Sequence, residues 1–124
     1  MGFGNVLLSL TAKQNIAMNV IIEDKDLEYL LEGKPKGKYK KLAKDGKFKR
    51  QLDLVYHTML DVERAGELAM FSYLHYEKLI GDRSGQSSVR IMNGRVERLI
   101  FTEHNGGITI KLIELNQEHY GNKR

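Results

Sequence analysis

Apolar residues recur at helical spacing in one long stretch of the chain. From residue 48 onward they stand four, three, four and three residues apart, at Phe48, Leu52, Val55, Met59 and Val62. This pattern is one face of an amphipathic helix, predicted to run from Lys47 to about Arg64 and to stop at Gly66. We interpret the stripe as core, because a single apolar face is what a helix packed on a sheet requires.

Beyond Ser84 the period changes from helical to two, which is typical of strands. Val89 and Ile91 alternate with polar residues, and Asn93-Gly94 then supplies the dipeptide that a type I′ hairpin turn prefers. A returning strand, a second turn and a third strand are predicted at Arg95–Glu103, His104–Gly107 and Ile108–Leu115.

The first half of the chain predicts one strand and two short helices. The strand is expected at Asn19–Glu23, and Asp24 can cap a helix from about Lys25 to Leu31, ended by Gly33 and Pro35. A second short helix is expected from Tyr39 to Lys44, broken by Gly46. The order is β-α-α-α-β-β-β, so we predict an α+β fold with the helices on one face of a small, mainly antiparallel sheet.

Residues 1–17 differ in character from the rest. We interpret them as a poorly ordered extension from an upstream start, with Met18 as the natural start of a domain that spans 18–124. The alternative is an added helix that packs through its four apolar residues, Val6, Leu7, Leu8 and Leu10.

Composition excludes several kinds of chemistry. The 124 residues contain no cysteine, which removes disulfides, thiolate catalysis and Cys-type zinc sites and fits a reducing compartment such as the cytoplasm. No apolar stretch approaches the ~20 residues needed to cross a bilayer. The acids are scattered and no phosphate-binding or dinucleotide motif occurs, so we expect neither a metal nor a cofactor.

Positive charge is concentrated in one window, residues 34–50. Nine Lys/Arg face one acid there, a net +8, while the rest of the chain carries −4 of the total +4. Such a window, which includes Lys40, Lys41 and Lys44, suits a polyanion such as RNA, because neutralised phosphates release counterions. The alternative is a solvated basic segment that keeps the protein soluble.

The segment "LHYEKLIGDRSGQSSVRI", the later "RLIF" and the terminal "HYGNKR" resemble the HigB branch of the RelE/ParE toxin superfamily. Five short matches occur in order between Leu74 and Tyr120. The resemblance implies a RelE-like fold and a ribosome-dependent endoribonuclease that cleaves mRNA without a metal. It also implies a helix-turn-helix antitoxin as partner. The ParE branch shares the fold but inhibits DNA gyrase, so the fold alone does not settle the target.

The resemblance also implies site residues. The candidate catalytic residues are His75, Lys78, Arg98, His119 and Tyr120, and the candidate RNA-binding residues are Arg83, Arg90, Lys40, Lys41 and Lys44. The chain departs from the family pattern in four places: two extra residues before Gly81, Glu97 in place of tryptophan, a hairpin about two residues longer, and a tail that reads His-Tyr. These departures affect the registers of Lys78 and of the tail.

Each candidate has an ordinary structural alternative. Arg83 and Arg90 can pair with Asp82 and neighbouring acids, which for Arg90 is the role we favour. His75 can be a half-buried histidine between Tyr73 and Tyr76, and these tyrosines can either stack on bases or pack. His57 and His104 are taken as non-catalytic.

Strand alternation makes a specific prediction for Arg98. It shares a face with Val96 and Ile100, opposite Leu99 and Phe101, so it points away from the helices if these cover Leu99 and Phe101. There it would line an anion site, with His75 and the tail on the same side. The rival interpretation is a RelE/ParE-fold binding protein without nuclease activity, either a gyrase inhibitor or a degenerate toxin that only binds its antitoxin.

Overall fold

The computed structural model describes residues 18–118. The three α-helices are α1 (Lys25–Leu31), α2 (Lys40–Ala43) and α3 (Gly46–Asp61). The five strands are β1 (Asn19–Ile22), β2 (Glu77–Lys78), β3 (Ser87–Arg90), β4 (Arg98–His104) and β5 (Thr109–Asn116). Four 3₁₀ turns connect them: η2 (Ala65–Met70), η3 (Ser72–Leu74), η4 (Gly81–Arg83) and η5 (Asn105–Gly107).

The strands form one mixed sheet in the order β1-β5-β4-β3-β2. Within residues 18–118, β1 and β5 pair in parallel, and the other three pairings are antiparallel. The α+β class with a mainly antiparallel sheet is therefore confirmed. The two-residue strand β2, which pairs with the start of β3, is absent from the predicted order because its polar Glu77-Lys78 pair has no strand periodicity.

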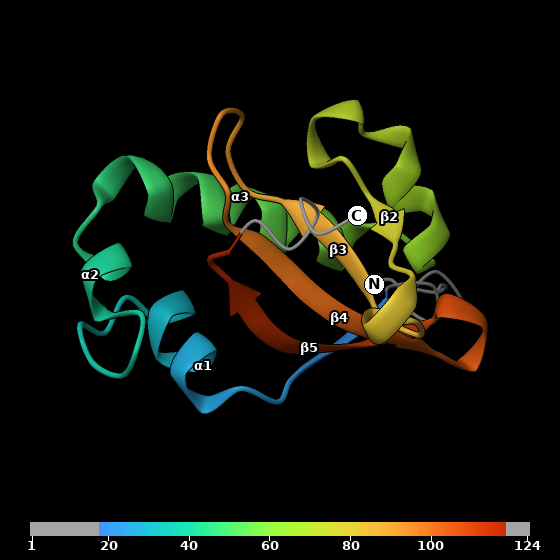
Figure 1. Ribbon diagram of the computed structural model, residues 1–124, viewed down its shortest axis with the longest axis horizontal. Helices are drawn as coiled ribbons and strands as arrows, with labels where there is room; N and C mark the ends of the chain where they lie inside the picture. Colours follow the sequence, from blue (N-terminus) through green and yellow to red (C-terminus); the bar gives the residue numbers. More distant parts are fainter. Residues whose placement is uncertain (1–17, 119–124) are drawn as a thin grey trace, which may run out of the picture.

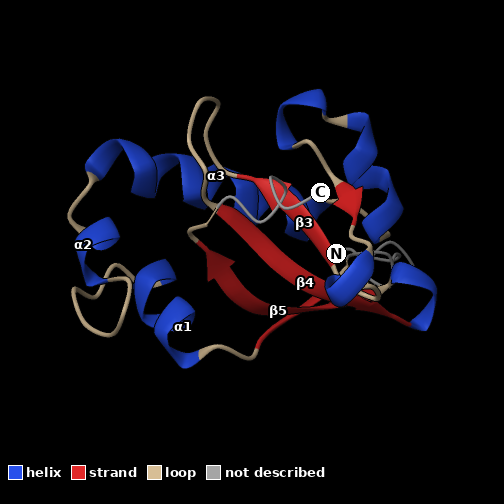
Figure 2. Cartoon of the chain, viewed as in Figure 1, coloured by secondary structure: helices blue, strands red, loops and turns tan. Residues whose placement is uncertain are grey.

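The helices cover one face of the sheet, and α3 crosses behind it in the view of Figures 1 and 2. The apolar stripe of α3 is buried as predicted and packs in one core with the inward side chains of the strands, such as Val89, Leu99 and Phe101. We call this the helix face of the sheet, and the opposite one the second face. Ile100 is also fully buried but lies outside that core, as expected for a side chain of the second face.

Carboxylate caps fix where two helices begin. The predicted cap of α1 is confirmed, because Asp24 Oδ1 accepts the backbone N–H of Asp26 at 3.0 Å. Asp45 caps α3 in the same way through the N–H of Phe48, at 3.1 Å. The second helix ends before Gly46, as predicted, but Gly46 is not the residue that breaks it, because Asp45 caps a new helix in which Gly46 is the first residue. The helix also ends at Asp61, three residues before its predicted end.

The β3–β4 hairpin differs from prediction at its turn. Only Gly94 has positive φ there, at 85°, so the Met92–Arg95 turn is not type I′, which needs positive φ at Asn93 as well. Strand β4 starts at Arg98 rather than Arg95. The Arg95 guanidinium leaves the strand pattern to bind Asp45 at 2.9 Å and both oxygens of Glu97 at 3.0 and 3.1 Å. The hairpin is thereby tied to the start of α3.

Candidate nucleic-acid site

Two arginines stand opposite each other on the second face of the sheet. The β3–β4 register pairs Arg90 with Arg98 and Ser88 with Ile100. Val89 and Leu99 belong to the core, so alternation turns Arg90 and Arg98 to the second face, as predicted for Arg98. Like charges at directly opposed strand positions repel. An anion bound between them would remove this repulsion.

Arg98 carries the most informative single atom of this face. Its Nη1 is buried and has no hydrogen-bond partner, and the Oγ of Ser88, two residue pairs along the hairpin, is also buried without a partner. Within residues 18–118 no carboxylate forms an ion pair with Arg98. A buried donor without a partner is costly, by about 1–3 kcal/mol and more when it is charged. Arg98 Nη1 and Ser88 Oγ are therefore two polar atoms of this face whose hydrogen bonds the fold leaves unmade.

Arg90 and Arg83 are held in different ways. Arg90 donates to Asn93 Oδ1 at 3.0 Å, so its partner is an amide rather than the acid we favoured from the sequence. Arg83, on η4, donates to Gln86 at 2.7 Å and approaches Glu114 of β5 at 3.5 Å. That contact brings η4 over the second face, in front of β4 and β5 in Figure 1.

His75 lies on the surface beside Arg90. It is exposed, and its backbone adopts the left-handed conformation, with φ 46° and ψ 50°. Non-glycine residues seldom adopt this conformation, although histidine does so more readily than most, and such residues cluster at functional sites. His75 and Arg90 line the same pocket, of about 480 Å³. His75 thus shares a pocket with Arg90, which stands opposite Arg98 in the sheet.

Lys78 lies in another pocket, on the helix face. Its Nζ approaches Glu103 Oε1 at 3.5 Å, while Glu103 Oε2 accepts hydrogen bonds from the hydroxyls of Tyr76 at 2.6 Å and Ser87 at 2.7 Å. This second pocket, of about 570 Å³, also includes Arg64. The structure therefore does not bring Lys78 together with His75 in one pocket.

The Glu103 group has shifted proton affinities. Burial alone would raise the pKa of Glu103, but the hydrogen bonds from Tyr76 and Ser87 and the charge of Lys78 more than offset it, so the pKa is lowered. Burial and the bond to Glu103 raise the pKa of Tyr76 to about 12. Tyr76 also stacks on Phe101, with ring centroids 6.3 Å apart. Of the alternatives for Tyr76, packing is the one the geometry supports.

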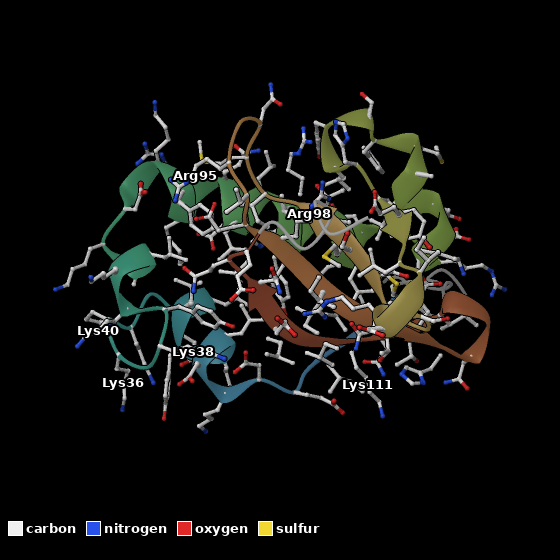
Figure 3. All side chains as sticks on the ribbon, in the orientation of Figure 1. Lys36, Lys38, Lys40, Arg95, Arg98 and Lys111 are labelled. Carbon is white, nitrogen blue, oxygen red and sulfur yellow. The ribbon has the colours of Figure 1, made fainter. Side chains whose placement is uncertain are left out.

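The lysine window forms a separate basic surface. Lys40, Lys41 and Lys44 are exposed on or next to α2. Figure 3 shows Lys36, Lys38 and Lys40 at one end of the molecule, well away from Arg98. The ammonium groups of Lys25, Lys34 and Lys36 surround the ring of Tyr29, at 4.6–6.0 Å from its centroid. This end of the molecule presents cations without belonging to the Arg90–Arg98 site.

One candidate was missed from the sequence, and two cannot be placed. Glu77 is exposed on β2 and pairs with Ser88, so it lies on the second face beside the arginine-bearing strands. Its only sequence signal was a carboxylate between His75 and Lys78. His119 and Tyr120 lie outside the described residues, as does the predicted extension 1–17. In the described part of the chain, no three His, Asp or Glu side chains gather as a metal site would require.

The fold is similar to that of a solved structure. A YoeB/ParE toxin from Agrobacterium tumefaciens has a similar solved structure, with a TM-score of 0.53 and 14% sequence identity. The similarity covers 82% of this chain and 100% of that one. No protein-family model matches the chain, and no curated protein matches it significantly. The chain thus shares an α+β fold with that protein. Among residues 18–118, no helix combines the length and apolar character needed to span a membrane.

Proposed function

We propose that this protein is the toxin of a type II toxin–antitoxin system and acts as a ribosome-dependent, metal-independent mRNA endoribonuclease. The observation that carries the proposal is Arg98, whose buried Nη1 lacks a partner at a position directly opposite Arg90. Planar guanidinium groups suit the non-bridging oxygens of a phosphate and stay charged through the reaction. The toxin-like fold and the ordered motifs from Leu74 to Tyr120 support the same assignment.

The chemistry needs a base for the 2′-hydroxyl, cations for the crowded phosphorus and an acid for the leaving 5′-oxygen. In the proposed site Arg98 and Arg90 are the cations. His75, which shares a pocket with Arg90, and Glu77, which pairs with Ser88, are our candidates for proton transfer, a step typically worth 10²–10⁴-fold. His119 and Tyr120 remain proposed members on the strength of the sequence motif. Lys78 is proposed with a lesser role, because Glu103 already engages its charge.

The proposed partners follow from the two positive surfaces. The Arg90–Arg98 site would hold the mRNA at the cleaved phosphate, and the lysine surface around α2 would contact ribosomal RNA. A co-expressed helix-turn-helix antitoxin would neutralise the toxin, as the resemblance to HigB-type toxins implies. Arg83, on η4, would bind the RNA, and its contact with Glu114 holds it over the second face.

The proposal is tested by Arg98→Ala in a translation extract with programmed ribosomes. The wild-type chain should cleave ribosome-bound mRNA, and the variant should lose about 10²–10³-fold in rate, as loss of one preorganised donor costs roughly 2–4 kcal/mol of transition-state stabilisation. Arg64→Ala is the matched control, since Arg64 lines the other pocket and, among residues 18–118, its side chain bonds only the loop carbonyl of Gly106. Its rate should equal the wild-type rate.

Three outcomes would count against the assignment. Unchanged cleavage by Arg98→Ala would make Arg98 a structural residue. Intact mRNA together with DNA damage and trapped gyrase, after induced expression of the full chain, would favour the ParE-like alternative. Normal protein synthesis in cells that accumulate folded protein would remove the toxin assignment altogether.

A further inference from the structure

The pocket beside Arg90 has features that the proposed cleavage chemistry does not use. It lies between α3, the η3 segment and the end of β3, and its volume of about 480 Å³ falls in the range of small-ligand sites, ~300–1,000 Å³. Gln51, Tyr73 and Met92 line it together with His75 and Arg90. It therefore combines an aromatic ring, an amide and a thioether next to a cation of the proposed phosphate site.

Tyr73 presents its ring in a fixed position. Its side chain is exposed (43% for the residue), yet the ring stacks on Phe71, with centroids 6.1 Å apart and an interplanar angle of 28°. Its hydroxyl lies 3.2 Å from Thr58 Oγ1 on α3. A large aromatic side chain that is held from two sides but remains exposed can stack on a planar ligand with little loss of conformational entropy.

Gln51 supplies polar groups that the fold leaves unused. It stands on α3, half-buried at the pocket wall, and within residues 18–118 its side-chain amide has no hydrogen-bond partner. An amide both donates and accepts, which suits the edge of a nucleobase. Arg90 belongs to both the pocket and the proposed phosphate site. Its guanidinium donates to Asn93, another residue of the pocket, and in the sheet Arg90 is paired with Arg98.

We propose that this pocket receives one unstacked base of single-stranded RNA, with Tyr73 stacking on the base and Gln51 contacting its edge. The adjoining phosphate would reach Arg90. Bases of single-stranded RNA are commonly read in this way, by stacking on aromatic side chains and by hydrogen bonds to their edges. The inference rests on the proposed function and deepens it, since the pocket would set which nucleotide lies next to the cleaved bond.

The test uses the full chain and fluorescent RNA heptanucleotides, without ribosomes. In a series each oligonucleotide carries one abasic nucleotide at a different position. One abasic position should weaken binding by about 5- to 150-fold, the range of a single base–aromatic stack. Tyr73→Ala should weaken the intact oligonucleotide by a similar factor and should have no further effect on that one abasic oligonucleotide. Tyr73→Phe keeps the ring and should bind almost as the wild type does.

Gln51→Ala should change which base is preferred at that position, and thermal melts should show that each variant is folded. Tyr29→Ala is the matched control, because Tyr29 lies under the lysines at the other surface, and its effect should not depend on the abasic position. Binding that is equal for every abasic position, or no binding of the heptanucleotide, would overturn the inference. Binding that depends on the abasic position, by a protein that cleaves no mRNA, would instead contradict the proposed function and still support the inferred base pocket.

Discussion

Arg98 and Lys78 are cations on strands of the same sheet, but they differ in whether a carboxylate lies beside them. Arg98 faces another arginine and keeps a buried nitrogen without a partner, so its charge is available to an anion. Lys78 is turned to the helix face, where the carboxylate of Glu103 already meets it. Among residues 18–118, then, an acid contacts one of the two predicted cations and not the other.

The Glu103 group makes a prediction about acid stability. Its folded-state pKa lies below the ordinary value of 4.5, so the stabilisation is fully present above that pH and is lost as pH falls through the lowered pKa. Glu103→Gln removes the titrating group, so its free energy of unfolding should fall less steeply than that of the wild type as pH drops below 4.5. Urea titrations at a series of pH values measure this slope.

Glu32→Gln is the matched control for that measurement. It removes an exposed carboxylate at the end of α1 and leaves Glu103 in place, so the steep fall of the wild type should be retained. Parallel slopes for Glu103→Gln and wild type would show that the hydrogen bonds from Tyr76 and Ser87 do not hold the carboxylate ionised.

At the scale of elements, α2 is a single helical turn that has one buried apolar residue and exposed lysines. Leu42 is buried in the core and anchors it, while Lys40, Lys41 and the following Lys44 stay exposed. A four-residue helix has little stability of its own, so the tertiary anchor holds the lysines in place. The element thus presents charge on a surface that the core fixes.

Reversing the charges of Lys40, Lys41 and Lys44 to glutamate should weaken ribosome binding if this surface docks on ribosomal RNA. The slope of log affinity against log salt should fall by about 0.7–0.9 for each phosphate that the protein no longer neutralises. Co-sedimentation with ribosomes at several salt concentrations measures both effects. Folding should be unaffected, because all three side chains are exposed.

Lys111→Glu serves as a control at a single site outside the lysine surface, on β5 beside Glu23. It should leave the salt slope at the wild-type value. An unchanged affinity and slope in the triple variant would return the α2 region to its alternative role as a solvated basic surface.

At the scale of the whole molecule, one hydroxyl joins three parts of the chain. Tyr39 is buried at the start of α2, and its hydroxyl donates to Asp24, the cap of α1, at 3.1 Å. The same oxygen accepts the backbone N–H of Leu115 on β5 at 2.9 Å. Burial, with the nearby charge of Asp24, raises the pKa of Tyr39 despite the bond from Leu115. This side chain therefore ties the basic end of the molecule to the sheet.

Tyr39→Phe should lower the free energy of unfolding by about 1–3 kcal/mol, because the buried N–H of Leu115 loses its acceptor. The urea midpoint should fall with an unchanged slope of free energy against denaturant. Tyr29→Phe, at a half-buried position of α1, should cause a much smaller change. Equal midpoints for Tyr39→Phe and wild type would mean that another acceptor replaces the hydroxyl.

Local patterns were enough to predict much of the fold. The core face of α3, the cap at Asp24 and the face of Arg98 each depend on residues a few positions apart, and periodicity records such neighbours. The prediction of a type I′ turn was wrong because the dipeptide Asn93-Gly94 favours that turn but does not require it. The start of β4 was missed for a related reason, since Arg95 binds Asp45, which is remote in sequence. At Arg95 the local preference for a strand is outweighed by the ion pair with Asp45.

By itself, the sequence determined the α+β class, the order of the main elements and the face of β4 on which Arg98 lies. These three features follow from the alternation of apolar and polar residues along the chain. Only the tertiary structure decided that Arg90 stands opposite Arg98, that His75 and Tyr73 share a pocket with α3, and that Glu103 engages Lys78. Those relations join residues up to 25 positions apart in the sequence. Strand register and packing bring them together, and no local period encodes either.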